Sequence, residues 1–267
     1  MKNGILKGKK GIIFGALDEN SIAWKTAERV FEEGGEFVLT NVATAARFGK
    51  VKELAEKTNA TFIPADATNM QDLENLFAET LKIFNGKIDF VLHSIGMSLN
   101  IRKGLQYQEL NYNYYMKTLD ISAISFHKIM QTAYKMDAMN EWGSIVALTY
   151  IAAQRIFDGY NDMADAKALL ESIARSFGYI FSRDKKVRVN TVSQSPVQTT
   201  AGKGIKQFGS LFDYAEKISP LGNADGYDAA NLIVMLFSDY TKKITMQNIY
   251  NDGGFSSMGV SKNFFED

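Results

Sequence analysis

Short apolar runs rich in valine, isoleucine and phenylalanine alternate along the chain with longer stretches that have the period of a helix. This alternation is typical of β-α units and of a parallel sheet buried on both faces. In the first helical stretch, residues 22–33, an apolar stripe ends at Gly34 and Gly35, which supply a C-terminal stop. The pattern predicts a Rossmann-type, doubly wound, seven-stranded parallel sheet flanked by helices. The predicted strands are 11–15, 36–41, 60–66, 88–96, 143–150, 187–196 and 247–254.

The composition narrows the class of protein. The 267 residues contain no internal repeat or low-complexity linker, so we expect a single domain over 1–267. The 30 Lys and Arg residues balance the 30 Asp and Glu residues and are dispersed, which argues against nucleic acid and favours a small-molecule partner. The absence of cysteine excludes disulfides, thiolate metal sites and cysteine nucleophiles. We find no signal peptide and no apolar run of roughly 18 residues, and therefore expect a cytoplasmic protein without membrane contact.

The loop after the first predicted strand has features of a phosphate site. In GIIFGALDENSIAWKTAERV the strand ends at Gly15, a polar loop follows, and a helix starts near Ser21. This order places unpaired backbone N–H groups and a helix N-terminus where a pyrophosphate can sit. The Ser21 hydroxyl is able either to cap the helix or to bind phosphate. The full G-x-G-x-x-G fingerprint is absent, so a plain strand-loop-helix connection explains this loop equally well.

Residues at three other strand ends point to the same kind of ligand. Asp66 follows the third strand, where its carboxylate can accept a hydrogen bond from an adenine amino group or cap the next helix. The fourth strand ends in SIG, and Gly96 lets the backbone approach a ribose. After the second strand stand Asn41 and Arg47, without an acid for the ribose hydroxyls. Together these strand ends predict a dinucleotide, with NADH favoured over NADPH.

The sequence GYNDMADAK at 159–167 places a tyrosine and a lysine on one face of a predicted helix. Side chains seven residues apart lie about 10 Å apart along a helix axis, and a long lysine at 167 can lean back toward Tyr160. The same spacing also occurs on ordinary solvated helices. The spacing by itself therefore leaves open a catalytic pair or a solvated helix face.

Six motifs, in order, resemble those of the bacterial enoyl-acyl-carrier-protein reductases of the short-chain dehydrogenase/reductase superfamily. They are SIA after the first loop, HSIG at 93–96, TY at 149–150, GYNDMADAK, SQSPVQTTAGKGI and a terminal DGGFS. The resemblance runs from about residue 6 to about residue 258. Its most specific element is the seven-residue spacing between Tyr160 and Lys167, where most of the superfamily has four.

The resemblance implies NADH-dependent reduction of the trans-2 double bond of enoyl thioesters carried by acyl carrier protein in fatty acid synthesis. It implies that Tyr150 and Tyr160 are the active-site tyrosines and that Lys167 binds the cofactor. Hydride addition leaves an enolate, and Tyr160 can donate a hydrogen bond to its oxygen. We expect a nearby Lys167 ammonium to lower the pKa of Tyr160. Tyr150 either positions substrate and supports the proton relay or is a buried tyrosine whose hydroxyl is satisfied.

The resemblance also implies the remaining contact residues. Those for the cofactor are Gly15, Ser21, Ile22, Asn41, Asp66, Ala67, Ile95, Gly96, Lys167, Val197, Gln198, Thr199, Thr200 and Ala201, with Pro196 beside the carboxamide. Those for the substrate are Ser98, Tyr150, Tyr160, Ile205 and Phe208. Asn41 stands where members of the family carry a different polar or basic residue, and the loop after it is one residue longer than theirs. Both differences lie in the part of the site that is expected to bind the adenosine end of the cofactor.

Residues 198–221 are expected to form an amphipathic lid over the substrate. Glycines at 202, 204 and 209 suggest that the segment orders on binding, and the alternative is a surface helix packed on the core. The resemblance implies that Lys203 and Lys206 meet the acidic acyl carrier protein. Gly209 and Ser210 stand where further positive charge is expected, which weakens that docking argument.

Two other functions fit the same fold. A short-chain carbonyl reductase acting on a ketone or an alcohol is disfavoured by Tyr150, which stands where such enzymes usually carry a serine, and by the seven-residue spacing. A non-catalytic dinucleotide sensor is disfavoured by the intact Tyr160 and Lys167. The family further implies a homotetramer, and we expect the aromatic cluster at 107–117 to pack a subunit or helix interface.

The two histidines are expected to be structural. Neither His93 nor His127 has a second ligand at a spacing typical of metal sites, and His127 lies in a helical stretch. The sequence therefore predicts no metal.

Overall fold

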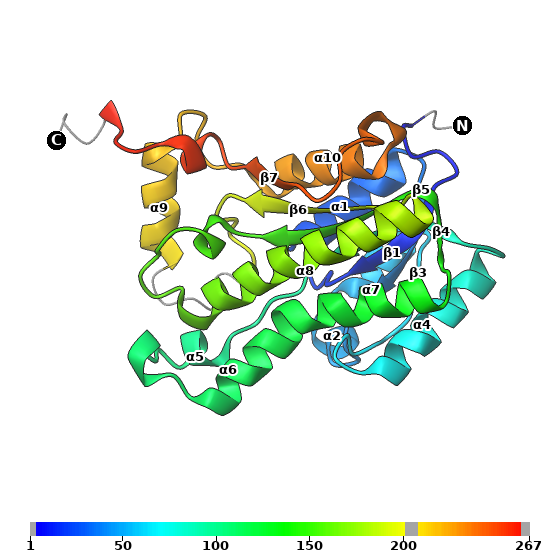
Figure 1. The fold of residues 1–267 in the computed structure, drawn as a ribbon, viewed down its shortest axis with the longest axis horizontal. Helices are drawn as coiled ribbons and strands as arrows, with labels where there is room; N and C mark the ends of the chain where they lie inside the picture. Colours follow the sequence, from blue (N-terminus) through cyan, green and yellow to red (C-terminus); the bar gives the residue numbers. More distant parts are fainter. Residues whose placement is uncertain (1–3, 201–207, 263–267) are drawn as a thin grey trace.

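The computed structural model describes residues 4–200 and 208–262. Within these ranges, seven strands form one sheet in the order β3-β2-β1-β4-β5-β6-β7, and every neighbouring pair is parallel (Figure 1). The strands are β1 (Lys10–Phe14), β2 (Glu36–Thr40), β3 (Thr61–Phe62), β4 (Ile88–His93), β5 (Met139–Thr149), β6 (Arg188–Gln194) and β7 (Asn248–Asn251). The predicted doubly wound fold is confirmed as one α/β domain.

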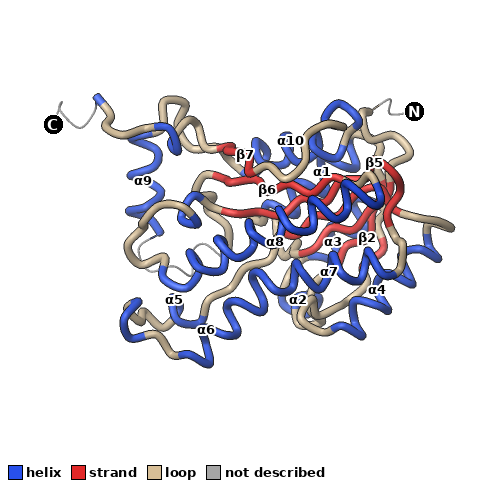
Figure 2. Tube along the Cα trace, viewed as in Figure 1, coloured by secondary structure: helices blue, strands red, loops and turns tan. Residues whose placement is uncertain are grey.

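Helices cover both faces of the sheet (Figures 1 and 2). One face carries α1 (Ile22–Glu32), α3 (Val51–Thr58) and α10 (Gly226–Phe237), and the other carries α4 (Met70–Ile83), α7 (Ser125–Lys135) and α8 (Asn161–Lys185). The remaining helices are α2 (Ala45–Phe48), α5 (Leu99–Arg102), α6 (Tyr112–Leu119) and α9 (Phe208–Ile218). A π-helical turn, Asp120–Ile124, joins α6 to α7, and 3-10 turns span Tyr107–Glu109, Ile151–Ala153, Asp239–Thr241 and Phe255–Ser257. None of the described helices is long and apolar enough to cross a bilayer.

Two hydrophobic layers lie on either side of the sheet because successive strand residues point to opposite faces. Ile12 packs into the layer with α4, α7 and α8, whereas Ile13 packs into the layer with α1, α3 and α10. In the second layer the rings of Phe90 and Phe237 stack with centroids 4.6 Å apart. Both faces are buried, which explains why the strands read as continuous apolar runs.

Four strands differ from the sequence prediction by three or more residues at one end, namely β3, β4, β5 and β7. β4 ends at His93 instead of residue 96, and β7 ends at Asn251 instead of residue 254. β3 was expected over 60–66 but is regular only at Thr61–Phe62, because Pro64 has no N–H to donate. The chain nevertheless stays beside β2, since Ile63 and Ala65 donate their N–H groups to the carbonyls of Leu39 and Asn41. β5 begins at Met139 instead of residue 143, and its pairing with β4 contains an irregularity between Ile88 and Phe90.

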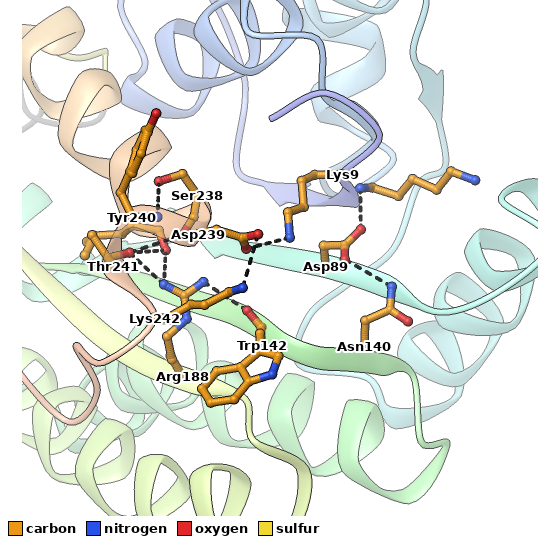
Figure 3. Close-up of polar contacts among 12 residues, drawn as sticks. Lys9, Asp89, Asn140, Trp142, Arg188, Ser238, Asp239, Tyr240, Thr241 and Lys242 are labelled. Atoms are coloured by element: carbon orange, nitrogen blue, oxygen red, sulfur yellow. Dashed lines mark hydrogen bonds and ion pairs between the residues drawn. The ribbon is translucent and has the colours of Figure 1, made fainter. Parts of the chain in front are cut away.

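The end of the sheet where the strands begin is held by a buried arginine (Figure 3). The guanidinium of Arg188, at the start of β6, donates to the carbonyls of Leu236 (2.9 Å) and Trp142 (3.0 Å) and to the Thr241 hydroxyl (2.6 Å). It thereby satisfies a carbonyl at the C-terminal end of α10 and ties β6 to the bend that opens β5. These contacts tie the amino ends of β5 and β6 to the C-terminal end of α10.

Candidate active site

A cavity of about 380 Å³ opens at the carboxyl ends of β1, β4, β5 and β6. This is the edge where ligands bind in open parallel sheets. The cavity brings together many of the predicted site residues, namely Gly15, Ser21, Ile22, Asn41, Ile95, Gly96, Ser98, Tyr150, Tyr160, Lys167, Val197, Thr199 and Thr200, together with Pro196. Residues that the sequence did not indicate complete the wall, among them Asp18, Ile101, Arg102, Thr149 and Met163.

Some predicted residues lie elsewhere. Asp66 is exposed, and its carboxylate accepts hydrogen bonds from the N–H (2.8 Å) and the hydroxyl (2.7 Å) of Thr68, while the cap of α4 is Asn69. Ala67 is buried and Gln198 is exposed, and neither lines the cavity. Their contact with a cofactor stays a prediction. Ala201, Lys203, Ile205 and Lys206 lie outside the described residues, and so does the side chain of Phe208.

The first loop is built around Gly15 and Ser21. Gly15 has a φ of +95°, and a Cβ there would lie 2.0 Å from the Ser94 carbonyl oxygen, so the crossing of this loop with the end of β4 requires glycine. The Ser21 hydroxyl donates to the Asp18 carbonyl (2.5 Å) and accepts from the Leu17 N–H (3.2 Å). Capping of α1 by this hydroxyl, one of the two expected roles, is wrong because the hydroxyl is used within the loop.

The N-terminus of α1 faces the cavity through Ser21 and Ile22. In the described part of the chain, the N–H groups of Ile22 and Ala23 have no hydrogen-bond partner. Unpaired N–H groups at the first turn of a helix attract an anion, and the helix dipole adds to this attraction. The loop is therefore suited to the pyrophosphate that its sequence predicted.

At the adenosine end, Asn41 fixes the turn after β2. Its amide donates to the Ala16 carbonyl (3.0 Å), and its oxygen accepts from the Val42 N–H (2.8 Å). Arg47 on α2 is exposed. The described residues of this turn include no Asp or Glu whose carboxylate could bind the ribose hydroxyls. An acidic side chain at this turn therefore does not decide between NADH and NADPH.

Lys167 reaches the centre of the cavity from α8. It is 7% exposed, and its ammonium donates to the Leu148 carbonyl at 2.8 Å. Burial lowers the pKa of Lys167 to about 8, and the Glu171 carboxylate one turn further along α8 partly opposes this shift. A Cβ on Gly96 would lie 3.9 Å from the ammonium nitrogen, so the glycine leaves room beside it. Since an ammonium has three N–H donors, two remain for ligand hydroxyls.

Tyr150 and Tyr160 lie side by side, with ring centroids 5.1 Å apart. Tyr150 follows β5 and is buried, and its hydroxyl has no hydrogen-bond partner among the described residues. The alternative of a buried tyrosine with a satisfied hydroxyl is therefore wrong. Tyr160 is the half-buried residue that precedes the first turn of α8.

Both phenols stay neutral at physiological pH. Burial raises the pKa of Tyr160, and burial together with the neighbouring Tyr160 and Asp252 raises the pKa of Tyr150. The expectation that Lys167 lowers the pKa of Tyr160 is wrong, because burial of the phenol dominates. A neutral phenol is the form that donates a hydrogen bond, so the direction of the shift suits a donor.

Two buried carboxylates on α8 escaped the sequence analysis. Asp162 lies between Tyr160 and Lys167, and Glu171 lies one turn after the lysine. Glu171 accepts hydrogen bonds from the side chains of Thr149 (2.9 Å), Gln154 (3.0 Å) and Asn248 (3.2 Å). Asp162 was visible in GYNDMADAK, but its burial was not, because its partners come from distant segments.

The expected structural role of the histidines agrees with their surroundings. His93 is fully buried at the end of β4, where its Nε2 lies 2.9 Å from the Ser125 hydroxyl. Burial and the charge of Lys167 lower the pKa of His93 to about 3, so its ring is neutral. His127 is exposed and lies edge-on against Phe177. Over the described residues, no three His, Cys, Asp or Glu side chains come close enough together to hold a metal ion.

Comparison with known proteins finds relatives that match the chain over almost its whole length. The enoyl-[acyl-carrier-protein] reductase [NADH] FabI of Rickettsia bellii is 34% identical over 266 residues, which cover 98% of this chain and 99% of the relative. The crystal structure of a FabI-NADH complex from Alistipes finegoldii superposes with a TM-score of 0.96 at 64% identity, covering 97% of this chain and 92% of that chain. The Bacillus cereus enoyl-acyl carrier protein reductase, solved with NADP+ and an indole naphthyridinone, superposes with a TM-score of 0.89 at 29% identity, covering 96% and 100%. The model of the family described as Enoyl-(Acyl carrier protein) reductase matches residues 15–256, and the chain belongs to this family.

Proposed function

We propose that this protein uses NADH to reduce the trans-2 double bond of enoyl thioesters of acyl carrier protein in fatty acid synthesis. The observation that carries the proposal is the meeting of Tyr150, Tyr160 and Lys167 in one cavity with the glycine loop of β1. The Rickettsia bellii relative is named an NADH enoyl reductase, and the Alistipes finegoldii structure is a complex with NADH. The protein is therefore proposed to be an oxidoreductase that acts on a carbon–carbon double bond.

The residues of the cavity fit NADH. The unpaired N–H groups at the start of α1 would hold the pyrophosphate, and the Lys167 ammonium would hold the nicotinamide ribose hydroxyls. The room that Gly96 leaves beside that ammonium supports this placement. When bound, NADH supplies the hydride for the β-carbon of the enoyl group.

The tyrosines act on the thioester oxygen. As the β-carbon gains a hydride, the electron pair of the double bond shifts toward that oxygen, and a donor aimed at it stabilises the developing charge. Tyr160 is a neutral phenol in the cavity wall and supplies this donor. The Tyr150 hydroxyl is buried and has no partner among the residues that the structure describes, so it is available to the same oxygen or to the proton that reaches the α-carbon.

The segment 198–221 is proposed to be the substrate lid. Leu211 on α9 lines the cavity and packs, together with Tyr160 and Phe157, against the cluster around Tyr150. An apolar side chain at this position suits an acyl chain that extends from the thioester. The docking of acyl carrier protein on Lys203 and Lys206 remains a proposal from the sequence.

The oligomeric state and location are also proposals. Tyr112 is 81% and Met116 is 59% exposed on α6, and Tyr179 on α8 is 56% exposed. Exposed apolar side chains of this kind suit contacts between subunits, and we propose a homotetramer in the cytoplasm. Light scattering measures the mass of the protein in solution and so tests the homotetramer. A mass equal to that of a single chain would contradict it.

The carbonyl reductase is the second candidate. The strand end that would need a free serine hydroxyl carries Tyr150, and the hydroxyl of the preceding Thr149 is bonded to Glu171. Incubation with a crotonyl thioester and either NADH or NADPH separates the candidates. We expect loss of reduced-nicotinamide absorbance with NADH. Turnover of a 3-ketoacyl thioester without turnover of the crotonyl thioester would favour the carbonyl reductase, and binding of NADH without any turnover would favour the sensor.

A further inference from the structure

Asp162 is a charged side chain in an enclosed position of α8. It is 0% exposed, and within the described residues no cationic side chain forms an ion pair with it. It lies two residues after Tyr160 and five before Lys167. Its place in the first turn of α8 lets the helix dipole stabilise a negative charge.

Three hydrogen-bond donors surround the carboxylate. The Ser98 hydroxyl donates to Oδ1 at 2.6 Å, and the Asn100 amide and the Thr118 hydroxyl lie 2.8 Å from Oδ2. All three partners are buried, with exposures of 6%, 0% and 1%. The two oxygens of a carboxylate can accept from all three donors. The single proton of the Thr118 hydroxyl also has the Tyr114 carbonyl within 3.0 Å, and the Asp162 oxygen is the nearer of the two acceptors.

These bonds join two walls of the cavity. Ser98 is the cap of α5, where its oxygen also accepts from the Ile101 N–H at 3.0 Å. Ser98, Ile101 and Arg102 line the cavity on one side, and Tyr160 and Lys167 line it from α8. Asp162 fastens α5 to the start of α8, and the neighbouring Asn161 adds a hydrogen bond from its amide to the Leu105 carbonyl at 2.6 Å.

This arrangement uses the proton and one of the two lone pairs of the Ser98 hydroxyl. Its single proton is directed to Asp162, and its oxygen accepts from Ile101. Asn100 links this cluster to α6, because its side-chain oxygen accepts a hydrogen bond from the N–H of Asn111, the residue that caps α6. The cluster therefore orders the whole connection from α5 to α6 on the substrate side of the cavity.

A purely stabilising role does not account for a charge at this place. Burying a carboxylate costs several kcal/mol, and well-packed apolar residues of similar volume often stabilise a core as well or better. What the carboxylate adds is a fixed geometry for three donors. We propose, on the basis of the proposed function, that Asp162 is a positioning residue, which sets the Ser98 wall against Tyr160 and so orients the enoyl thioester.

The test uses the near-isosteric substitution Asp162→Asn, which replaces one accepting oxygen by an NH₂ group and leaves a single accepting oxygen for the three donors. We expect kcat for a crotonyl thioester to fall at least about tenfold, because misplacement on the order of 1 Å can cost on the order of 100-fold. The dissociation constant of NADH should stay within about twofold, since the cofactor side of the cavity keeps its contacts. Asp165→Asn is the matched control on the same helix. Its carboxylate accepts from the exposed Tyr107 hydroxyl, and its kcat should equal the wild-type value.

A double-mutant cycle gives a readout that simple destabilisation would not produce. Ser98→Ala removes the donor on Oδ1, so its effect on kcat should be clearly smaller in the Asp162→Asn background than in the wild type. Hydrogen exchange of the backbone at 98–105 should speed up in Asp162→Asn while exchange in the central strands stays unchanged. Should Asp162→Asn fail to fold, Ser98→Ala alone must show the lower kcat and the faster local exchange.

The outcomes separate this proposal from the proposed function. A wild-type protein that leaves the enoyl thioester unreduced overturns the function and this role with it. A wild-type protein that turns over, together with an Asp162→Asn variant of equal kcat, overturns the positioning role alone. Additive effects of Ser98→Ala and Asp162→Asn would overturn it as well.

Discussion

The ammonium of Lys167 donates a 2.8 Å hydrogen bond to the main-chain carbonyl of Leu148. This bond anchors the cation of α8 to β5, the strand that Tyr150 follows. Tyr160 directly precedes the first turn of α8. The bond between Lys167 and Leu148 therefore also fixes the position of Tyr160 relative to Tyr150. The site is thus assembled where one long helix crosses the end of one strand.

Substitution of Tyr160 by phenylalanine tests the proposed donor. Tyr160→Phe keeps the ring that packs against Tyr150 but removes the hydroxyl. We expect kcat for the crotonyl thioester to fall by about 100- to 1000-fold, the usual cost of losing one donor to a developing oxyanion, with an unchanged dissociation constant for NADH. Tyr240→Phe, at an exposed position that does not line the cavity, is the control and should leave kcat unchanged. Full activity of Tyr160→Phe would disprove the donor role.

Substitution of Lys167 tests the cofactor contact. Lys167→Ala removes the only described cation beside Gly96, and we expect the dissociation constant of NADH to rise at least about tenfold, as for loss of a charge-assisted hydrogen bond. Titration of protein fluorescence with NADH measures it. Lys185→Ala, at the far end of α8 in a surface pair with Asp137, should bind NADH normally. Wild-type affinity in Lys167→Ala would remove the lysine from the cofactor site.

NADH affinity should depend on pH through Lys167. With its pKa lowered to about 8, the ammonium is present below that pH and is lost as the pH rises through it, so affinity should decline above pH 8. The Glu171 carboxylate raises this pKa, and Glu171→Gln should therefore move the decline to lower pH. Dissociation constants measured across the range give the midpoint. The same midpoint in both proteins would show that Glu171 does not act on Lys167.

His93 should make the protein sensitive to acid. Its pKa is about 3 in the folded protein against about 6.5 when unfolded, so below pH 6.5 the unfolded state binds more protons and stability falls with decreasing pH. Between pH 7 and pH 5 this predicts a loss of about 2 kcal/mol in the free energy of unfolding. Urea denaturation at each pH measures this loss.

The loss should be smaller in His93→Gln, whereas His127→Gln, at an exposed position, should lose as much stability as the wild type. An equal loss of unfolding free energy in all three proteins would show that His93 is not the cause.

Arg188 should contribute strongly to stability. Arg188→Met leaves the Trp142 carbonyl without its guanidinium donor, and leaves the Leu236 carbonyl only the hydrogen bond from the Thr241 hydroxyl at 3.2 Å (Figure 3). We expect a loss of about 1–3 kcal/mol in the free energy of unfolding, which is the cost of an unsatisfied buried acceptor. The exposed Arg183→Met is the control and should change stability by less than about 1 kcal/mol. If Arg188→Met and Arg183→Met had the same free energy of unfolding, the buried guanidinium would not be needed for stability.

The sequence predicted the parts of the structure that depend on local pattern. Seven apolar runs became seven strands, and the spacing of Tyr160 and Lys167 on one helix was visible in a single stretch. The boundaries of β3 and β5 were missed because they depend on hydrogen bonds to neighbouring strands. The direction of the pKa shift of Tyr160 was missed because burial is a property of the folded chain.

The cluster around Asp162 shows the same limit more sharply. Its partners Ser98, Asn100 and Thr118 lie 64, 62 and 44 residues away in the chain. No periodicity or motif connects residues at such separations, and only the crossing of α8 with α5 and α6 brings them together. A buried aspartate without a cation could therefore be found only in the fold.

The most direct test of the proposed function is the mass of the product. Acyl carrier protein loaded with a trans-2-enoyl group is incubated with the protein and NADH and then weighed by mass spectrometry. The account predicts that the acyl group gains the mass of two hydrogen atoms, and that Tyr160→Phe slows this gain. An unchanged enoyl mass, with NADH shown to bind, would contradict it.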